Sequence, residues 1–141
     1  MKQTLAGKRV LITQSGDFMG PALCEVFAEQ GACVVASAED LSAPDAPGRV
    51  VAAAGPIDVL VANLAFPAPT TLATGVSDLE WQTVFAALVD PLPRLVRAAV
   101  PGMVQRGAGK VLVVGSAAAL RGMKRASTYL SLIHISEPTR H

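Results

Sequence analysis

The side chains whose types and spacing bear on chemistry include two cysteines, one tyrosine and one serine. Cys24 and Cys33 lack C-x-x-C spacing and have no histidine cluster nearby, so we expect two small apolar side chains and no metal site. The only tyrosine is Tyr129; an ordinary tyrosine has a pKa of about 10 and becomes a base near neutral pH only where a cation favours its phenolate. Ser116 stands thirteen residues earlier, directly after an apolar run. Its hydroxyl could hold a substrate oxygen, or it could cap the helix that follows.

The elements that would position these residues alternate along the chain. Short apolar runs bounded by turn residues predict strands, and apolar residues at helical spacing predict helices. Ser77 and Glu80 form a predicted capping box at the start of the last helix. The predicted strands are 9–13, 32–37, 57–62 and 110–115, and the predicted helices are 20–30, 49–54 and 77–106, the last one interrupted near Pro91 and Pro93.

This alternation predicts an α/β fold, a Rossmann-type doubly wound parallel sheet that is truncated after its fourth strand. Right-handed crossovers favour the strand order 3-2-1-4, which places a ligand crevice between the first and fourth strands. The loop after the first strand and Ser116 would both lie at that crevice.

Composition and charge limit the classes of partner. The 141 residues are 51% apolar with a formal net charge of +1, and no basic stripe or acidic run stands out. We therefore expect one domain with a small-molecule substrate, rather than a partner that is a nucleic acid or a membrane. The start of the chain lacks the pattern of a signal peptide, and the sparse cysteines suit a reducing compartment, so a cytoplasmic location is expected.

The composition changes abruptly after Tyr129. Both histidines, His134 and His141, fall within the last twelve residues. Residues 130–140 match the in-frame translation of a transposon-based sequencing adapter at eleven consecutive positions. We therefore expect two parts: an enzyme segment, residues 1–129, and a non-native tail, residues 130–141, whose histidines carry no functional weight.

Three segments resemble the short-chain dehydrogenase/reductase superfamily: Leu5–Thr13, Ile57–Asn63 and Gly115–Tyr129. The likeness covers residues 5–129, roughly the N-terminal half of a typical member. It implies that Ser116 and Tyr129 are catalytic, because members carry a serine after the fourth strand of this frame and a tyrosine thirteen residues later. It also implies that the intact parent protein is a homo-tetramer or a homodimer.

Several positions depart from the members that use a nicotinamide cofactor. Those members carry Thr-Gly-x-x-x-Gly-x-Gly after the first strand, because a Cβ at the glycines would collide with the dinucleotide pyrophosphate. Here Gln14 and Phe18 stand at two glycine positions, and we expect the Phe18 ring to fill the space that a nucleotide needs. No carboxylate stands at the tip of the second strand, and Leu88 replaces the asparagine of the proton relay.

These departures resemble the halohydrin dehalogenases, relatives that kept the fold and abandoned the cofactor. The resemblance implies that the parent needs no cofactor and converts a vicinal haloalcohol to an epoxide and halide. Tyr129 would take the hydroxyl proton and Ser116 would hold the oxygen. The loop residues Thr13, Phe18 and Gly20 would bind the halide, or else remain as the remnant of a cofactor loop.

The third catalytic residue of the resemblance cannot be identified in this sequence. The dehalogenases carry an arginine four residues after the tyrosine, and cofactor-using members carry a lysine there. That position is Ile133, inside the expected foreign tail. We therefore expect the chain, as it stands, to be inactive.

Two other functions remain open. The parent could be an NAD(P)-dependent oxidoreductase with a divergent cofactor loop, which would bind NADP or NAD, or it could be a non-catalytic scaffold homologue. The site residues also have structural alternatives, since Phe18 could be a core aromatic in a reshaped turn and Tyr129 could serve only in packing.

Overall fold

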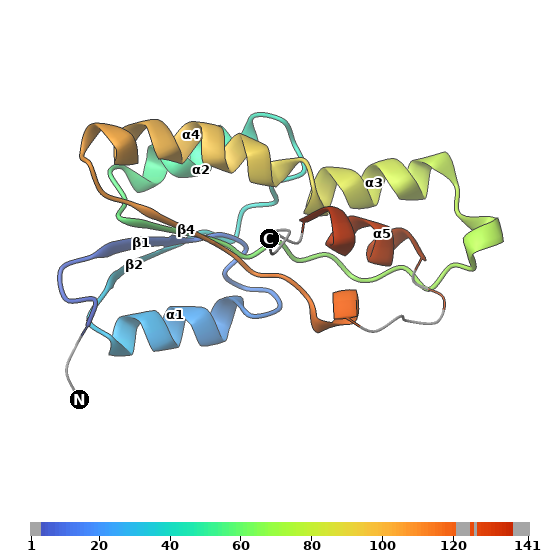
Figure 1. The fold of residues 1–141 in the computed structure, drawn as a ribbon, viewed down its shortest axis with the longest axis horizontal. Coiled ribbons are helices and arrows are strands. Elements are labelled where there is room, and N and C mark those ends of the chain that lie inside the picture. Colours follow the sequence, from blue (N-terminus) through green and yellow to red (C-terminus); the bar gives the residue numbers. More distant parts are fainter. Residues whose placement is uncertain (1–3, 121–124, 126, 137–141) are drawn as a thin grey trace.

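The computed structural model describes residues 4–120, 125 and 127–136, and its centre is a parallel sheet (Figure 1). The strands are β1 (Arg9–Ile12), β2 (Cys33–Ala36), β3 (Val59–Ala62) and β4 (Lys110–Val113). The helices are α1 (Gly20–Glu29), α2 (Ala46–Ala54), α3 (Asp78–Leu88), α4 (Pro91–Gln105) and α5 (Ser127–Ser136), with short 3-10 turns at Ala73–Gly75 and Ala117–Leu120. The predicted α/β class with a parallel, doubly wound sheet is confirmed.

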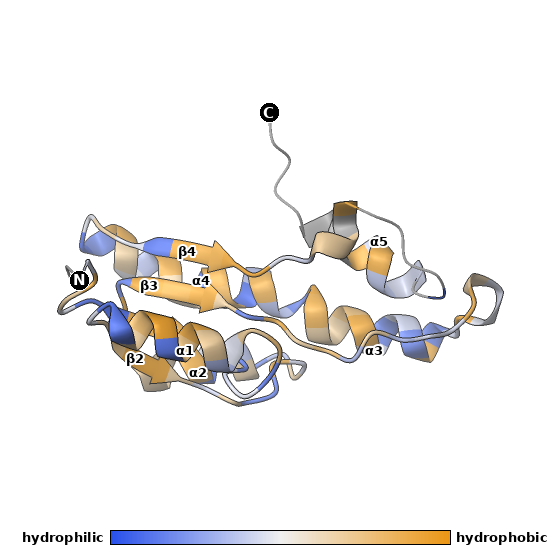
Figure 2. Cartoon of the chain, turned by 90° about the horizontal axis from the view of Figure 1, so that it is seen from below, coloured by the Kyte–Doolittle hydropathy of each residue, from blue (hydrophilic) through white to orange (hydrophobic). Residues whose placement is uncertain are grey.

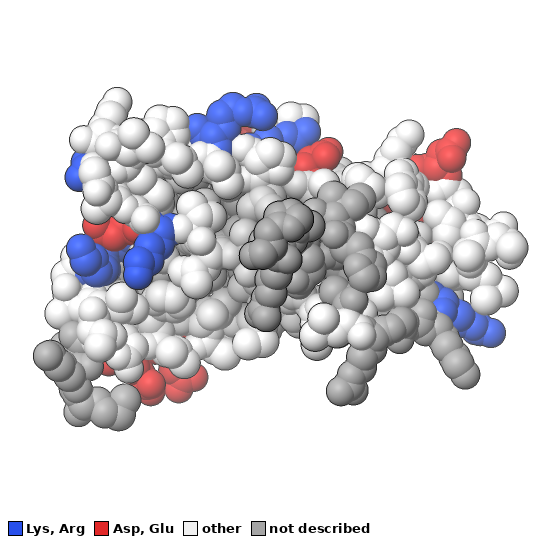
Figure 3. All heavy atoms as spheres, in the orientation of Figure 1, with Lys and Arg blue, Asp and Glu red and all other residues white. Residues whose placement is uncertain are grey.

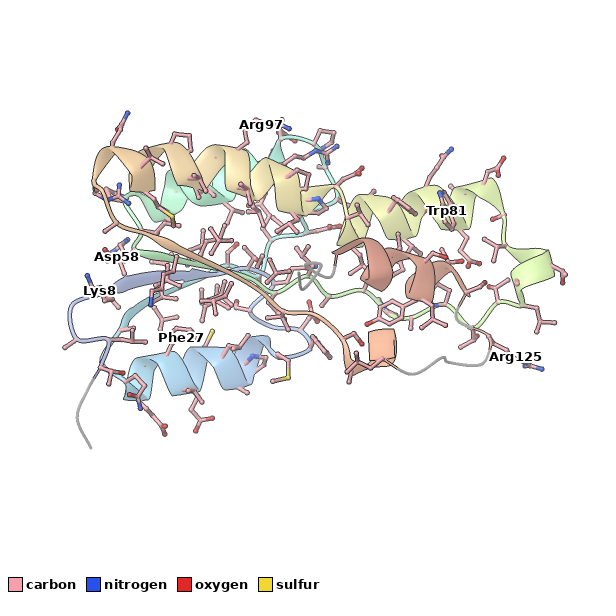
Figure 4. All side chains as sticks on the ribbon, in the orientation of Figure 1. Lys8, Phe27, Asp58, Trp81, Arg97 and Arg125 are labelled. Carbon is pink, nitrogen blue, oxygen red and sulfur yellow. The ribbon has the colours of Figure 1, made fainter. Side chains whose placement is uncertain are left out.

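Helices cover both faces of the sheet. α1 lies on one face, while α2 and α4 pack together on the other (Figure 1). Because successive side chains of a strand point to opposite faces, Ile12 packs toward α1 and Leu11 packs toward α2 and α4. Phe27 points from α1 toward the sheet (Figure 4), and Leu95 of α4 is fully buried against the opposite face. The strands are therefore apolar on both sides, as parallel sheets of this class require.

The strand order is β2-β1-β3-β4, so the predicted order 3-2-1-4 is wrong. β1 pairs with β2 on one side and with β3 on the other, with Ile12 opposite Ala36 and Val61. The connection from β1 through α1 leads to β2 on one side of β1, and the connection from β2 through α2 leads to β3 on the other side. Because the strand order reverses at β1, the crevice lies between β1 and β3 rather than between the first and fourth strands.

The helix α2 begins earlier than predicted. Residues up to 48 were expected to form a loop, but α2 begins at Ala46. Pro47 is tolerated in the first turn of a helix, because its missing N–H would have no partner there.

The Ser77 side chain accepts a hydrogen bond from the Glu80 N–H at the start of α3, as a capping box requires. The Glu80 carboxylate does not reach back; it accepts hydrogen bonds from Thr71 and Thr128 instead.

α3 and α5 lie next to each other beyond the carboxyl ends of the strands (Figures 1 and 2). Their contact is apolar and includes the buried residues Val84, Leu88 and Leu132, with Tyr129 packed against them. Tyr129 therefore projects from a formed helix that is anchored on α3, and its position follows from this packing.

β4 forms an edge of the described sheet, and its side chains are exposed although they are apolar. Val111, Leu112 and Val113 are 38%, 45% and 40% exposed. Figure 2 shows α1 lying over β1 and β2, while β3 and β4 have no described helix in front of them. One face of the sheet is thus covered over only part of its width.

Charged side chains are scattered over the surface. Figure 3 shows Lys and Arg in separate groups, several of them beside Asp or Glu. Lys8 and Asp58, 3.9 Å apart, lie at the amino ends of the strands, at the far end of the molecule from Trp81 on α3 (Figure 4). Among the described residues, no helix is long and apolar enough to cross a membrane.

The Gly20→Ala substitution should destabilise the fold, because a Cβ at this position would lie 2.5 Å from the Ser15 backbone oxygen and 2.7 Å from that of Gln14. We expect the free energy of unfolding to fall by about 1–3 kcal/mol, measured by urea denaturation. Gly48→Ala is the matched control, since a Cβ there meets nothing within 4 Å and lies inside α2. Unchanged stability of Gly20→Ala would show that α1 does not approach the loop so closely.

Candidate active site

The carboxyl ends of β1 and β3 are tied together by Thr13, which is fully buried. Its hydroxyl lies 3.2 Å from the Asn63 carbonyl oxygen and 3.4 Å from that of Val61, and it accepts a hydrogen bond from the Asn63 N–H at 3.1 Å. Thr13 was predicted to belong to an anion-binding loop, but its hydroxyl faces the protein. Its role in the structure is to join the two strands on either side of the crevice.

Asn63 holds the loop between β1 and α1 from the other side. Its Nδ2 donates to the backbone oxygens of Gln14, at 2.9 Å, and Asp17, at 3.0 Å. Both Nδ2 hydrogens are used in this way, so the amide orientation is fixed by its partners. The other amide atom, Oδ1, is buried without a partner among the described residues. The loop is therefore shaped by a side chain of the neighbouring strand.

The loop retains the backbone of a glycine-rich turn at the positions that lack glycine. Gln14 has φ +43° and Phe18 has φ +52°, both in the left-handed region that side chains disfavour by roughly 1 kcal/mol or more. Gly16, which lies between these two residues, has open space around the place of a Cβ. Within the described residues, the N–H groups of Phe18 and Met19 have no acceptor, and α1 begins directly after them. Such a helix start attracts anions.

Phe18 does not fill the crevice, and the expectation that it would is wrong. Its side chain is 64% exposed, because the left-handed backbone turns it away from β1 and toward the end of the molecule that carries α5. There it lines a cavity together with Leu64, Leu88 and Tyr129. Phe18 thus lines the cavities that also contain Tyr129 and does not line the cavity beside β2.

Ser116 and Tyr129, the two residues that the resemblance implies to be catalytic, line the same cavity. Ser116 follows β4, and its Oγ accepts a hydrogen bond from the Ala118 N–H at 3.2 Å, so it also caps the short turn that follows. The hydroxyl hydrogen remains available, since no acceptor for it lies among the described residues. Next to this cavity is a larger one of about 370 Å³, lined by Asp17, Phe66 and Tyr129 among others.

A third cavity, which the sequence did not reveal, lies on the β2 side of the loop. It measures about 330 Å³ and its walls include Gln14, Asp17, Asp40 and Thr83. Asp40 lies four residues beyond the end of β2, too far along the sequence to be recognised as a residue at the strand tip. Hydrogen bonds from the Ser42 N–H and hydroxyl lower the pKa of Asp40, so its carboxyl stays ionised at neutral pH.

A family model describes the part of the chain that carries Ser116 and Tyr129, but not the loop between β1 and α1. The model of the short chain dehydrogenases matches residues 40–131, more than half of the sequence. The chain belongs to the short-chain dehydrogenase family.

Curated short-chain dehydrogenases show the same relationship at low identity. The chain is 25% identical over 150 residues to the 3-oxoacyl-(acyl-carrier-protein) reductase of Vibrio harveyi, covering 89% of this chain and 61% of that protein. It is 28% identical over 156 residues to dehydrogenase/reductase SDR family member 4 of Oryctolagus cuniculus, covering 91% and 60%. Across the curated relatives it matches, the chain spans between about half and three-fifths of their length.

Solved structures of short-chain dehydrogenases superpose closely on this chain. L-Sorbose reductase from Gluconobacter frateurii, in complex with NADPH and L-sorbose, has a TM-score of 0.86 and 26% identity, covering 96% of this chain and 62% of that one. A dehalogenation enzyme has a TM-score of 0.82 and 26% identity, covering 92% and 62%. The fold is thus shared with both kinds of enzyme that the sequence resembles.

The expectation that no cofactor is needed is wrong. The family is that of the dehydrogenases, and the sorbose reductase contains NADPH. The expectation rested in part on residue types at two glycine positions, whereas the backbone at Gln14 and Phe18 keeps the conformation that glycine adopts. Among the described residues, the N–H groups of Phe18 and Met19 have no acceptor and a Cβ at Gly16 would meet nothing within 4 Å, so the backbone of the loop offers donors and room for a pyrophosphate.

The Thr13→Val substitution should loosen the link between β1 and β3, because it removes the hydroxyl that accepts a hydrogen bond from the buried Asn63 N–H and leaves that group the Val61 carbonyl oxygen as its acceptor among the described residues. We expect a loss of about 1–3 kcal/mol in the free energy of unfolding, measured by urea denaturation. Thr13→Ser keeps the hydroxyl and is the control. If the two variants were equally stable, the hydroxyl would have no part in joining the strands.

Proposed function

We propose that the full-length protein is an NAD(P)-dependent oxidoreductase that interconverts an alcohol and a carbonyl compound. The observation that supports this most strongly is that Ser116 and Tyr129 line one cavity with Phe18, the residue that leads into the anion-attracting start of α1. Residues able to handle a substrate oxygen thus stand beside a loop able to hold a pyrophosphate. Membership of the dehydrogenase family supports the same function.

Tyr129 and Ser116 would act on the same substrate oxygen. In the reductive direction Tyr129 gives its proton to the carbonyl oxygen, and in the oxidative direction its phenolate takes the proton of the hydroxyl. Ser116 donates a hydrogen bond to that oxygen, because its own Oγ is already held in place by the Ala118 N–H. When bound, the nicotinamide ring supplies or accepts the hydride at the adjacent carbon.

A tyrosine that takes a proton from an alcohol near neutral pH works with a neighbouring cation, because an ordinary tyrosine has a pKa of about 10. Leu64, Leu88 and Phe66, which pack near Tyr129, carry no charge. Position 133, one helical turn later on α5, carries Ile133, which has no charge. On the interpretation that residues 130–141 are foreign, we propose that the natural protein carries lysine there.

The cavity beside β2 favours NAD over NADP. Asp40 and Asp17 both line it, and the 2′-phosphate of NADP would bring further negative charge next to these carboxylates. A ribose 2′-hydroxyl can instead donate a hydrogen bond to a carboxylate such as Asp40. Arg49 stands near, but its guanidinium is paired with Glu39 and Asp45.

Titration of the full-length protein with NADH and NADPH, followed by fluorescence, tests the proposal. We expect saturable binding of NADH, with NADPH weaker by roughly tenfold, and we expect Asp40→Asn to remove most of this difference. Glu29→Gln, an exposed substitution at the far end of α1, should leave both dissociation constants unchanged. Absence of binding for both nucleotides would refute the proposed function.

Tyr129→Phe should separate catalysis from cofactor binding. We expect kcat for NADH-dependent reduction of a ketone to fall by about 10²–10⁴-fold, because the proton donor is lost, while the dissociation constant of NADH stays the same. Ser116→Ala should lower kcat by less, since it removes a hydrogen bond and no proton. A Tyr129→Phe enzyme with wild-type kcat would show that another group handles the proton.

Haloalcohol dehalogenation is the second candidate. It is supported by the likeness to the dehalogenation enzyme and by Leu88, which lines the catalytic cavity where an oxidoreductase of this family would carry a relay asparagine. Halide release from a vicinal haloalcohol, lost in Tyr129→Phe, would favour this activity over alcohol oxidation.

A further inference from the structure

The Gln14 side chain bridges the two loops that border the crevice. Its Oε1 accepts a hydrogen bond from the Ala65 N–H at 2.7 Å, and its Nε2 donates to the Ala65 carbonyl oxygen at 3.1 Å. Ala65 N–H can only donate and its oxygen can only accept, so one amide orientation satisfies both contacts. We call this pair of hydrogen bonds the Gln14 clasp. It is largely buried, with Gln14 only 8% exposed.

The Gln14 clasp lies between the cavity beside β2 and the cavity beside Tyr129. The cavity beside β2 and the larger one beside Tyr129 share three lining residues, Asp17, Ala65 and Phe66. Gln14 lines the first of these cavities and contacts Ala65, which belongs to both. A ligand long enough to reach from Asp40 to Tyr129 must therefore pass the clasp.

We propose that Gln14 is a specificity-determining residue whose clasp competes with a dinucleotide for the crevice between the β1 and β3 loops. This inference rests on the proposed function, because it concerns binding of the same cofactor. Seating the dinucleotide requires the Gln14 side chain to release Ala65 and move aside. The clasp thereby weakens the binding of long ligands that cross between the cavities.

The backbone of Gln14 explains why the side chain reaches Ala65. The left-handed φ of +43° and the hydrogen bond from Asn63 Nδ2 to the Gln14 carbonyl hold the residue at the mouth of the crevice. Glycine at this position would keep the same backbone without strain and without a clasp. A shorter side chain would leave the Ala65 N–H and carbonyl free for a ligand or for water.

The test compares NADH binding by the full-length wild type, Gln14→Gly and Gln14→Ala, using fluorescence titration, with amide hydrogen exchange at Ala65 as a second readout. We expect Gln14→Gly to bind NADH about tenfold more tightly, the effect of removing a competing interaction of ordinary hydrogen-bond strength. Gln14→Ala should also bind more tightly, but less so, because its Cβ remains at a left-handed position. In both variants the Ala65 amide should exchange faster in the absence of NADH.

The outcomes separate this inference from the proposed function. Saturable NADH binding with the same dissociation constant in all three proteins would overturn the competition and leave the oxidoreductase proposal standing. Absence of NADH binding in all three would overturn the proposed function and the competition with it. Unchanged exchange at Ala65 in both variants would show that the clasp does not exist in solution.

Discussion

The site depends on the cross-link between the ends of β1 and β3, made by Thr13, Gln14 and Asn63. In parallel sheets of this type, neighbouring strands whose crossovers diverge leave a gap at their carboxyl ends. Here the gap is spanned by side-chain hydrogen bonds that fix the two loops relative to each other. These bonds hold the loop that precedes α1 against the loop that follows β3, and the Gln14 side chain separates the cavity beside β2 from the cavity beside Tyr129.

This cross-link also explains how a loop with few glycines keeps a glycine-rich shape. The Asn63 side chain donates hydrogen bonds to the carbonyl oxygens of Gln14 and Asp17. These bonds offset the conformational cost of the left-handed backbone at Gln14. A left-handed residue of this kind persists where surrounding contacts over-determine it. At this turn, Gln14 and Phe18 therefore adopt the backbone conformation of glycine although both carry large side chains.

Much of the fold could be predicted from the sequence, because strands that are buried on both faces leave continuous apolar runs. Ser116 and Tyr129 were recognised by their spacing, and the structure brings them to one cavity. The strand order was predicted wrongly, because it depends on the side of β1 to which the chain returns after α2, and the composition of the strands does not determine that side. The direction of Phe18 depends on the sign of one backbone angle, and the place of Asp40 depends on a loop without periodicity.

The exposed apolar side chains of β4 have a consequence for synthesis. Val111, Leu112 and Val113 have the pattern of a strand that is enclosed on both sides, yet in the described residues they face solvent. A growing polypeptide in which β4 had just left the ribosome would expose these apolar side chains and the outer edge of β4 until other residues or a chaperone covered them. Slow elongation beyond residue 113 would therefore increase the yield of aggregates, because these apolar side chains would stay exposed for longer.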